Sequence, residues 1–279
     1  MAYKTILTVL RNEAEARRVM PVAIALARRF DSHLVAVHAE PSPVSYSTPE
    51  GFPDTDFIER SLRDCEQRAA DMKAYVETEC AAEGINVEWM STVTFAGDSA
   101  VAALPIAFNS DLIIAGQTDP SDSRVGYANV EALLFESGRP VLFVPFAGKL
   151  DVNTEHAVVA WNGTRESARA VFDALPLLKD AGKVEVLLID AQSNEDQDAA
   201  TAGADIAEAL MRHGITVDVR NLHSDGLTIA AIIENYMADS GAGLLVMGGY
   251  SHSRLREMIF GGTTRTILSS MPSLTLMSH

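Results

Sequence analysis

The sequence predicts an α/β protein of two tandem domains, residues 1–149 and 150–279, each a five-stranded parallel sheet with helices on both faces. Apolar runs of strand length alternate with amphipathic helical segments along the chain. The second half repeats the plan of the first and aligns with it without a gap over about forty residues, with Glu15 over Ser167. A chain of 279 residues is also long enough for two domains of ordinary size.

The first half shows the alternation most clearly. Strands are expected where apolar residues run together, at residues 4–10, 33–39, 85–92, 112–116 and 140–145. Helices are expected where apolar residues recur at helical spacing, at residues 14–30, 56–83 and 99–108, with Asp98 capping the third. Strands that alternate with helices form parallel sheets through right-handed crossovers, and such sheets bind ligands beyond the carboxyl ends of their strands.

Composition narrows the class of protein. A chain with 47% hydrophobic and 22% charged residues is typical of a soluble globular protein with a sizeable core. Its net charge is −16 and the two halves share that charge equally, so neither half offers a basic face for nucleic acid or an anionic membrane. The chain reaches Arg11 after a short apolar run, which predicts neither a signal peptide nor a spanning helix, and the cytoplasm is the expected location.

The two cysteines, Cys65 and Cys80, fall in one predicted helix. Fifteen residues of helix rise separate them by about 22 Å, which is too far for a disulfide bond. We expect both to be reduced and structural.

One stretch in the second half carries the strongest sequence signal. The apolar run at residues 244–247 ends in Gly248 and Gly249, and a polar loop then leads to Gly261 and Gly262, followed by two threonines. Glycines allow tight turns and close approaches, so backbone amides in this stretch can cradle an anion. The alternative is that the glycine pairs only make a turn and interrupt a helix.

This stretch resembles the nucleotide-binding motif of the universal stress proteins, which reads G-x-x-G, nine residues, then G-S or G-T. Gly248 takes the first glycine position, Ser251 the second and Gly261 the third, and Gly262 takes the hydroxyl position, so two of the four positions depart from the motif. The resemblance covers the whole chain as a tandem of two such domains, through element order and the closing strand. It implies a Rossmann-like fold of the adenine nucleotide alpha hydrolase type.

The resemblance also implies a ligand, ATP or another adenine nucleotide with Mg²⁺ as its companion ion, bound in the second half. Asn162 holds the position of the family's adenosine-contacting Asp, and Ile189 or Asp190 holds the position after the second strand, where the family's backbone meets the base. Arg254, Arg256 and Arg265 would offset phosphate charge. The implied contacts are Ala160, Trp161, Asn162, Ile189, Asp190, Met247, Gly248, Gly249, Ser251, His252, Ser253, Arg254, Gly261, Gly262, Thr263 and Thr264.

The first half is expected to bind no nucleotide. Leu10 stands at the adenosine-contacting position and cannot hydrogen-bond a ribose, while Asp119 places negative charge where phosphates would lie. At most one nucleotide per chain is therefore expected.

Other polar residues give weaker signals. His252, Ser253 and Arg254 are adjacent, but no nucleophile elbow or zinc-ligand spacing accompanies them, so no catalytic residue is assigned. Weak nucleotide hydrolysis is the most that is expected, with Asp190 and Asp225 as candidates by analogy alone. His38 and His223 are expected to be hydrogen-bonded core or rim histidines and not metal ligands.

Two functions remain open. The first is a nucleotide-binding regulatory protein of the stress response. The second is a structural or interaction protein that acts through dimerisation, which Ser251 and Gly262 favour. The resemblance implies that the last strands of the two domains, residues 140–144 and 273–277, pair within one chain and that a homodimer forms. Pairing would cover two exposed sheet edges.

Overall fold

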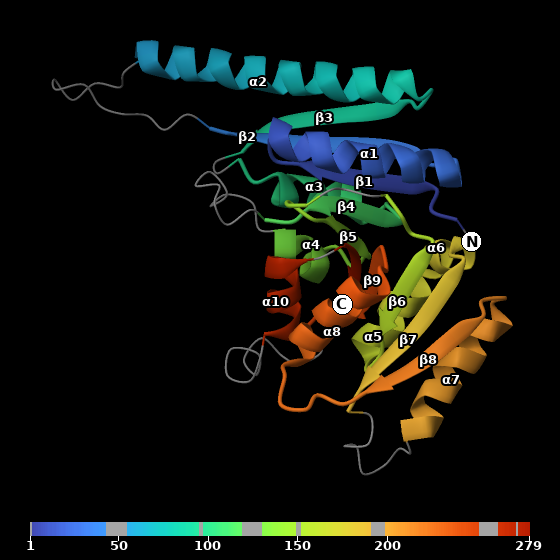
Figure 1. Ribbon diagram of the computed structural model, residues 1–279. Helices are drawn as coiled ribbons and strands as arrows, with labels where there is room; N and C mark the ends of the chain where they lie inside the picture. The colour runs from blue at the N-terminus through green and yellow to red at the C-terminus, as the bar shows by residue number, and fades with distance from the viewer. Residues whose placement is uncertain are drawn as a thin grey trace. The chain divides into compact units, whose positions relative to one another are not determined.

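The computed structural model describes residues 2–42, 55–94, 97–118, 130–148, 152–190, 199–250, 262–271 and 273–279. The chain forms two compact α/β units (Figure 1). One is Lys4–Ser137, and the other combines Met1–Tyr3 with Gly138–His279. Packing places the strand at residues 141–144 with the 138–279 unit. The expected domain boundary at residue 149 was drawn from the sequence repeat, and it stays a prediction.

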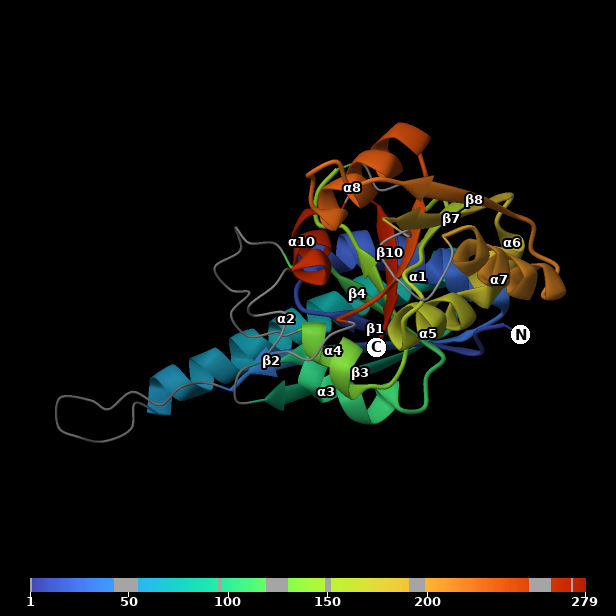
Figure 2. The same ribbon diagram turned by 90° about the horizontal axis from the view of Figure 1, so that it is seen from below.

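The 4–137 unit contains four parallel strands in the order β3-β2-β1-β4. The strands are β1 (Thr5–Leu10), β2 (His33–Pro41), β3 (Val87–Thr94) and β4 (Leu112–Gly116). The helices are α1 (Glu13–Phe30), α2 (Thr55–Ala82), α3 (Ser99–Ala107) and α4 (Val130–Glu136). Right-handed crossovers place α1 and α2 on one face of these strands and α3 and α4 on the other, as Figure 2 shows.

The 138–279 unit contains strands in the order β5-β10-β9-β6-β7-β8. The strands are β5 (Val141–Val144), β6 (His156–Ala160), β7 (Lys183–Ile189), β8 (Val217–Leu222), β9 (Leu244–Gly248) and β10 (Leu274–Ser278). The helices are α5 (Arg165–Asp173), α6 (Leu175–Asp180), α7 (Ala199–Arg212), α8 (Ile229–Ser240) and α10 (Thr263–Ser270). β5 runs antiparallel to β10, and the other pairs are parallel. The expected pairing of the two closing strands is confirmed.

Local sequence explains where the helices begin. Asn12 caps α1 by accepting a hydrogen bond from the Glu15 amide. Asp98 caps α3 and accepts from the amides of Ala100 and Val101, as predicted. Thr164 caps α5 by accepting from the Ser167 amide. Each cap satisfies backbone donors that the first helical turn leaves unpaired.

The hydrophobic core is built around strands whose side chains are apolar on both faces of the sheet. Every residue of β4 and β5 is buried, as expected of strands that are covered on both faces. Cys65 and Cys80 are buried free thiols on α2, in agreement with the sequence prediction. No helix in the described part of the chain has the length and apolarity that a bilayer crossing requires.

Candidate functional site

The carboxyl ends of β6, β7, β9 and β10 meet at one edge of the 138–279 unit. Ala160 lies opposite Met247 on one side and Leu187 on the other. Gly248, the last residue of β9, lies opposite Ser278. The structure thus brings three predicted site residues, Ala160, Met247 and Gly248, to the same edge, where parallel α/β sheets form ligand crevices.

The turn after β6 is held by side chains as well as backbone. The Trp161 amide donates to the Leu187 carbonyl at 2.9 Å. Oδ1 of Asn162 accepts from the Thr164 amide at 3.2 Å and from its hydroxyl at 2.8 Å. Gly163 adopts a φ of 70° between them, a conformation that favours glycine. Asn162 therefore stabilises the turn that leads into α5, and it remains exposed to solvent.

Gly248 has a packing reason to be glycine. A Cβ at this position would lie 2.5 Å from the Ser167 amide nitrogen and 2.6 Å from the Glu166 carbonyl carbon. Both are backbone atoms at the start of α5, which cannot move aside as a flexible side chain could. This glycine lets the end of β9 lie directly against the start of α5, so scaffolding alone accounts for it.

Asp190 follows β7 at the same edge. Its φ is 52°, and its amide donates to the Leu222 carbonyl at 3.0 Å. Oδ1 of Asp190 accepts from the Ser224 amide at 3.0 Å and lies 3.9 Å from Nδ1 of His223. Hydrogen bonds from the Ser224 hydroxyl and amide lower the pKa of Asp190. The result is a half-exposed anionic acceptor at the rim, with Ile189 half-buried beside it.

The first turn of α10 is tied to the end of β9. The Tyr250 amide donates to Oγ1 of Thr264 at 3.0 Å, and Thr264 is buried. The Gly249 amide donates to the Ser278 carbonyl at 2.8 Å. Gly262 begins α10 with no side-chain cap, and Thr263 follows it at the first helical position. The amino terminus of α10 therefore lies at the edge that carries Gly248.

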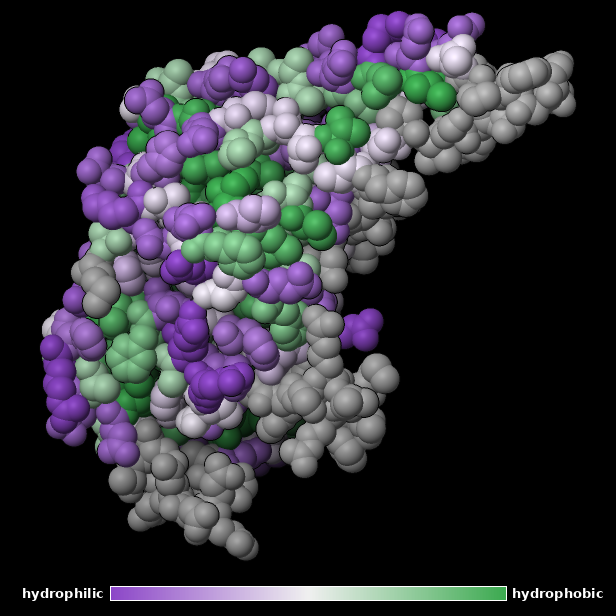
Figure 3. Space-filling model, turned by 180° about the vertical axis from the view of Figure 1, so that it is seen from behind, coloured by the Kyte–Doolittle hydropathy of each residue, from purple (hydrophilic) through white to green (hydrophobic). Residues whose placement is uncertain are grey.

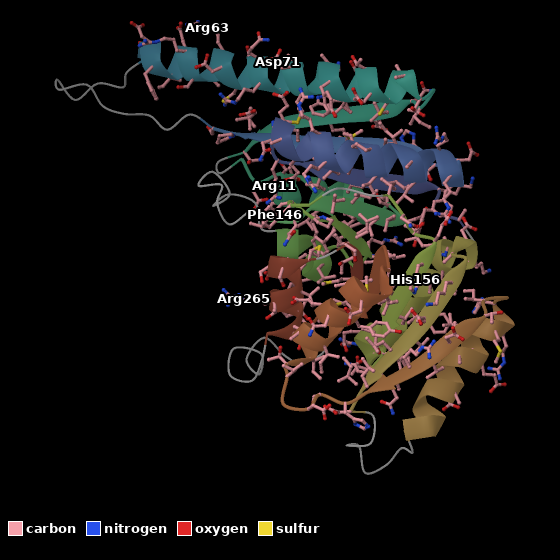
Figure 4. The ribbon with its side chains drawn as sticks, in the orientation of Figure 1. Arg11, Arg63, Asp71, Phe146, His156 and Arg265 are labelled. Atoms are coloured by element: carbon pink, nitrogen blue, oxygen red, sulfur yellow. The ribbon has the colours of Figure 1, made fainter. Side chains whose placement is uncertain are left out.

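The remaining predicted residues lie outside the described part of the chain. They are Ser251, His252, Ser253, Arg254 and Gly261, together with Arg256. Arg265 is described and is exposed on α10, where Figure 4 labels it. The two ends of the glycine loop, at Tyr250 and Thr264, are therefore neighbours in the structure. The role of residues 251–261 between them stays a prediction from the sequence.

Solved structures with the same architecture cover nearly the whole chain. A universal stress protein from Archaeoglobus fulgidus DSM 4304 matches 98% of this chain and 95% of its own, with a TM-score of 0.73 and 17% identity. The chain has the fold of the universal stress proteins. A putative universal stress protein from Pseudomonas aeruginosa UCBPP-PA14 matches 99% of this chain and 93% of its own, with a TM-score of 0.58 and 15% identity.

A third structure, a functionally unknown protein from Pseudomonas aeruginosa PAO1, matches 99% of this chain and 92% of its own, with a TM-score of 0.56 and 15% identity. No protein family model matches the chain, and no curated protein sequence matches it either. The similarity is therefore one of fold, and it extends over both units of the universal stress protein architecture.

The equivalent edge of the 4–137 unit, also of universal stress protein fold, is filled by side chains. The Nε atom of Arg11 lies 2.5 Å from Oε2 of Glu15, and its Nη2 atom donates to the carbonyls of Gly116 and Gln117 at 3.1 Å and 3.0 Å. Sequence reasoning named Leu10 and Asp119 as reasons to expect no nucleotide in this unit, and it overlooked Arg11; Asp119 lies outside the described residues. The sequence did carry a signal for this ion pair, because Arg11 and Glu15 are four residues apart after a predicted strand. The second half has Gly163 and Ser167 at the equivalent positions.

His38 lies at the end of β2 in the same unit. It is 2% exposed, its Nδ1 is 2.9 Å from the Leu10 carbonyl, and its Nε2 is 3.0 Å from Oε1 of Glu40. The prediction of a hydrogen-bonded core histidine is confirmed. His223, with a side chain 60% exposed, is a rim residue. Within the described ranges, no three His, Cys, Asp or Glu side chains gather to hold a metal ion.

A cluster of charged residues lies at the opposite ends of the strands in the 138–279 unit. Glu185 on β7 is 1% exposed and contacts His156 at 2.6 Å, Lys183 at 3.1 Å and Arg220 at 3.3 Å. Burial acts to raise the pKa of Glu185, but hydrogen bonds from these side chains and from Tyr236 outweigh it and lower the pKa to about 2. Sequence reasoning missed this cluster, which lies at the other end of the strands from Ala160 and Gly248.

Proposed function

We propose that the 138–279 unit binds ATP or another adenine nucleotide, and that the chain is a cytoplasmic regulatory protein of the stress response. The observation that carries the proposal is the bond between the Tyr250 amide and Thr264 Oγ1. This hydrogen bond ties the start of α10 to the end of β9, and the turn at Asn162 and the Asp190 carboxylate follow the neighbouring strands β6 and β7 at the same edge. The shared fold with universal stress proteins agrees with this assignment.

The phosphates belong at the amino terminus of α10 in this proposal. Unpaired amides and the helix dipole attract anions at a helix start, and Gly262 brings no capping side chain that would compete. Arg265 in the first turn contributes positive charge nearby. Mg²⁺ would accompany the phosphates as part of the ligand, with its coordination completed by water.

The nucleoside belongs between the turn after β6 and the end of β7. The Asp190 carboxylate is an acceptor for ribose hydroxyls or an exocyclic amine. The Asn162 amide supplies both a donor and an acceptor, although its Oδ1 already receives two hydrogen bonds from Thr164. We assign the site a role in binding and regulation and no catalytic residue.

A thermal-shift titration tests the proposal. Purified protein is heated with Mg-ATP, AMP, cyclic AMP and, as a non-adenine control, GTP. A ligand that binds only the folded state raises the melting temperature by mass action, and ligand at about 100 times its dissociation constant adds about 2.7 kcal/mol of stability. Absence of a shift with every adenine nucleotide would overturn the proposal.

Two substitutions at one position make the test specific. Asn162→Leu places the residue of the equivalent position, Leu10, in the crevice, and we expect it to abolish the shift. Asn162→Asp restores the family's residue and keeps the acceptor for Thr164, so we expect the shift to grow. Asn109→Leu, an exposed substitution on the other unit, is the matched control and should leave the ATP shift unchanged.

A second candidate function, interaction through dimerisation, is favoured by the outer side of α3. Residues 99–108 carry no charge, and Val101 and Phe108 are 52% and 53% exposed. Figure 3 shows apolar residues gathered on the side of the 4–137 unit that carries this helix. On a chain of net charge −16, an uncharged apolar face can meet its own copy without placing like charges opposite each other.

We therefore propose a second copy of the chain as the occupant of this face. Light scattering during gel filtration should give a dimer for the wild type and a monomer for Val101→Glu. The control Met211→Glu, at a residue 56% exposed on α7, should remain a dimer. A wild-type protein that stays monomeric at high micromolar concentration would contradict this second candidate.

A further inference from the structure

We infer that the crevice of the 4–137 unit is a receptor for a planar cation, and that the chain fills it with its own Arg11. The receptor lies at the carboxyl ends of β1 and β4, where Val9 pairs with Ala115 and Arg11 and Gly116 follow. This is the place at which open parallel sheets accept ligands. The inference concerns this unit alone and does not rest on the proposed nucleotide site.

Four acceptor groups converge on the Arg11 guanidinium. Oε2 of Glu15 accepts from Nε at 2.5 Å, and Oγ1 of Thr118 lies 3.3 Å from Nη1. The carbonyls of Gly116 and Gln117 accept from Nη2 at 3.1 Å and 3.0 Å. A planar guanidinium spreads its donors in fixed directions and so satisfies acceptors on several sides at once. Figure 4 labels Arg11 at this end of the strands.

The receptor keeps its negative charge out of water. The side chains of Arg11 and Glu15 are each 8% exposed. Oε1 of Glu15 is also buried, and backbone amides of Gly116 and Arg11 act on the same carboxylate. Burial raises the pKa of Glu15, and it outweighs the opposing effects of the Arg11 guanidinium and of the Gly116 and Arg11 backbone amides. A buried carboxylate favours a cationic occupant and repels phosphate.

Gly116 shows that the backbone is shaped for this carboxylate. A Cβ on Gly116 would lie 2.7 Å from both Cδ and Cγ of Glu15. The equivalent residue, Gly248, instead meets the backbone of Ser167. The absence of a side chain at Gly116 therefore leaves room for Glu15, whereas its absence at Gly248 leaves room for the start of α5.

The two crevices consequently favour ligands of opposite charge. In the alignment of the halves, Arg11 corresponds to Gly163 and Glu15 to Ser167. The 138–279 unit thus has neither the carboxylate nor the guanidinium at these positions. Its edge carries the start of α10, which favours an anion. The edge of the 4–137 unit carries converging acceptors, which favour a cation.

Chemical rescue tests the inference. Arg11→Ala removes the occupant and leaves the acceptors, and we expect a clear loss in melting temperature. Methylguanidinium chloride at millimolar concentration should raise the melting temperature of Arg11→Ala by several degrees in a saturable way. Tetramethylammonium chloride at equal ionic strength should not, because it lacks donors. The wild type, whose receptor is filled, should show no methylguanidinium shift.

Matched variants separate a receptor from a salt effect. Arg11→Met fills the space with an uncharged chain and should not be rescued. Arg11→Ala/Glu15→Gln removes the carboxylate and should respond at least tenfold more weakly to methylguanidinium. Equal shifts in the wild type and Arg11→Ala, or no shift in a folded Arg11→Ala protein, would overturn the inference.

A second variant covers the outcome in which Arg11→Ala does not fold. Arg11→Lys keeps the charge but presents a compact ammonium that cannot span four acceptors. We expect it to fold with a lower melting temperature than the wild type. An Arg11→Lys protein as stable as the wild type would show that a planar cation is not required, and would equally overturn the inference.

Discussion

Nε2 of His156 lies 2.6 Å from Oε2 of Glu185, although 29 positions separate the two residues in the chain. β6 and β7 run side by side with His156 opposite Lys183, and Glu185 lies two residues further along β7. Figure 4 labels His156 at the start of β6. This contact anchors the charged cluster at the amino ends of the strands, and its energetics can be tested by pH.

Glu185→Gln should lower the free energy of unfolding near neutral pH by roughly 3 kcal/mol, the equivalent of a pKa lowered from 4.5 to about 2. Because the folded-state pKa is below the unfolded-state value, the contribution is complete above about pH 4.5 and disappears as the pH falls toward 2. Urea unfolding at a series of pH values measures the difference between variant and wild type. A difference that does not shrink in acid would contradict this account.

The matched control is Glu88→Gln. Glu88 lies 2.9 Å from Nε2 of His33, but both side chains are more than half exposed. Solvent screening limits such a surface pair to about 1 kcal/mol or less. Losses of equal size in Glu185→Gln and Glu88→Gln would show that burial of Glu185 does not strengthen its interactions.

Gly248→Ala should destabilise the 138–279 unit by about 1 to 3 kcal/mol, the usual range for overpacking a well-packed core. The added methyl group would lie 2.5 Å from the backbone nitrogen of Ser167. Gly262→Ala is the control, because the nearest atom to its Cβ would be Cβ of Arg265 at 3.4 Å. Thermal unfolding of both variants distinguishes them, and an undisturbed Gly248→Ala protein would refute the packing role of this glycine.

Tyr3→Phe should cost about 1 kcal/mol, the usual net value of a buried hydrogen bond. The Tyr3 hydroxyl donates to the Asp173 carbonyl at 2.7 Å, and Tyr3 is 4% exposed. Tyr3→Ala should cost about 3 to 5 kcal/mol, since it also leaves a cavity. Denaturant titration measures both losses. If the two variants were equally stable, packing of the ring would contribute nothing.

Much of the fold could be predicted from sequence because its signals are local. The strand at residues 112–116 is β4, and the cap at Asp98 begins α3. The pairing of β5 with β10 followed from the resemblance and from the need to cover sheet edges. These features depend on apolar runs, capping side chains and element order, all of which are visible in one sequence.

The two polar clusters could not be predicted because they depend on register between distant strands. Arg11 meets Gln117 across 106 positions only because β1 pairs with β4. Glu185 meets Arg220 across 35 positions only because β7 pairs with β8. A one-residue slip in either pair would turn these side chains to the other face of the sheet. The glycines were visible in the sequence, but the atoms that their missing side chains would contact were not.

Equilibrium dialysis with labelled ATP tests the central claim most directly, because it counts bound nucleotide per chain. We predict that binding to the wild type saturates at one nucleotide per chain, and that Asn162→Leu binds none. Saturation at two would contradict the filled crevice at Arg11. The absence of saturable binding would contradict the nucleotide site in the 138–279 unit.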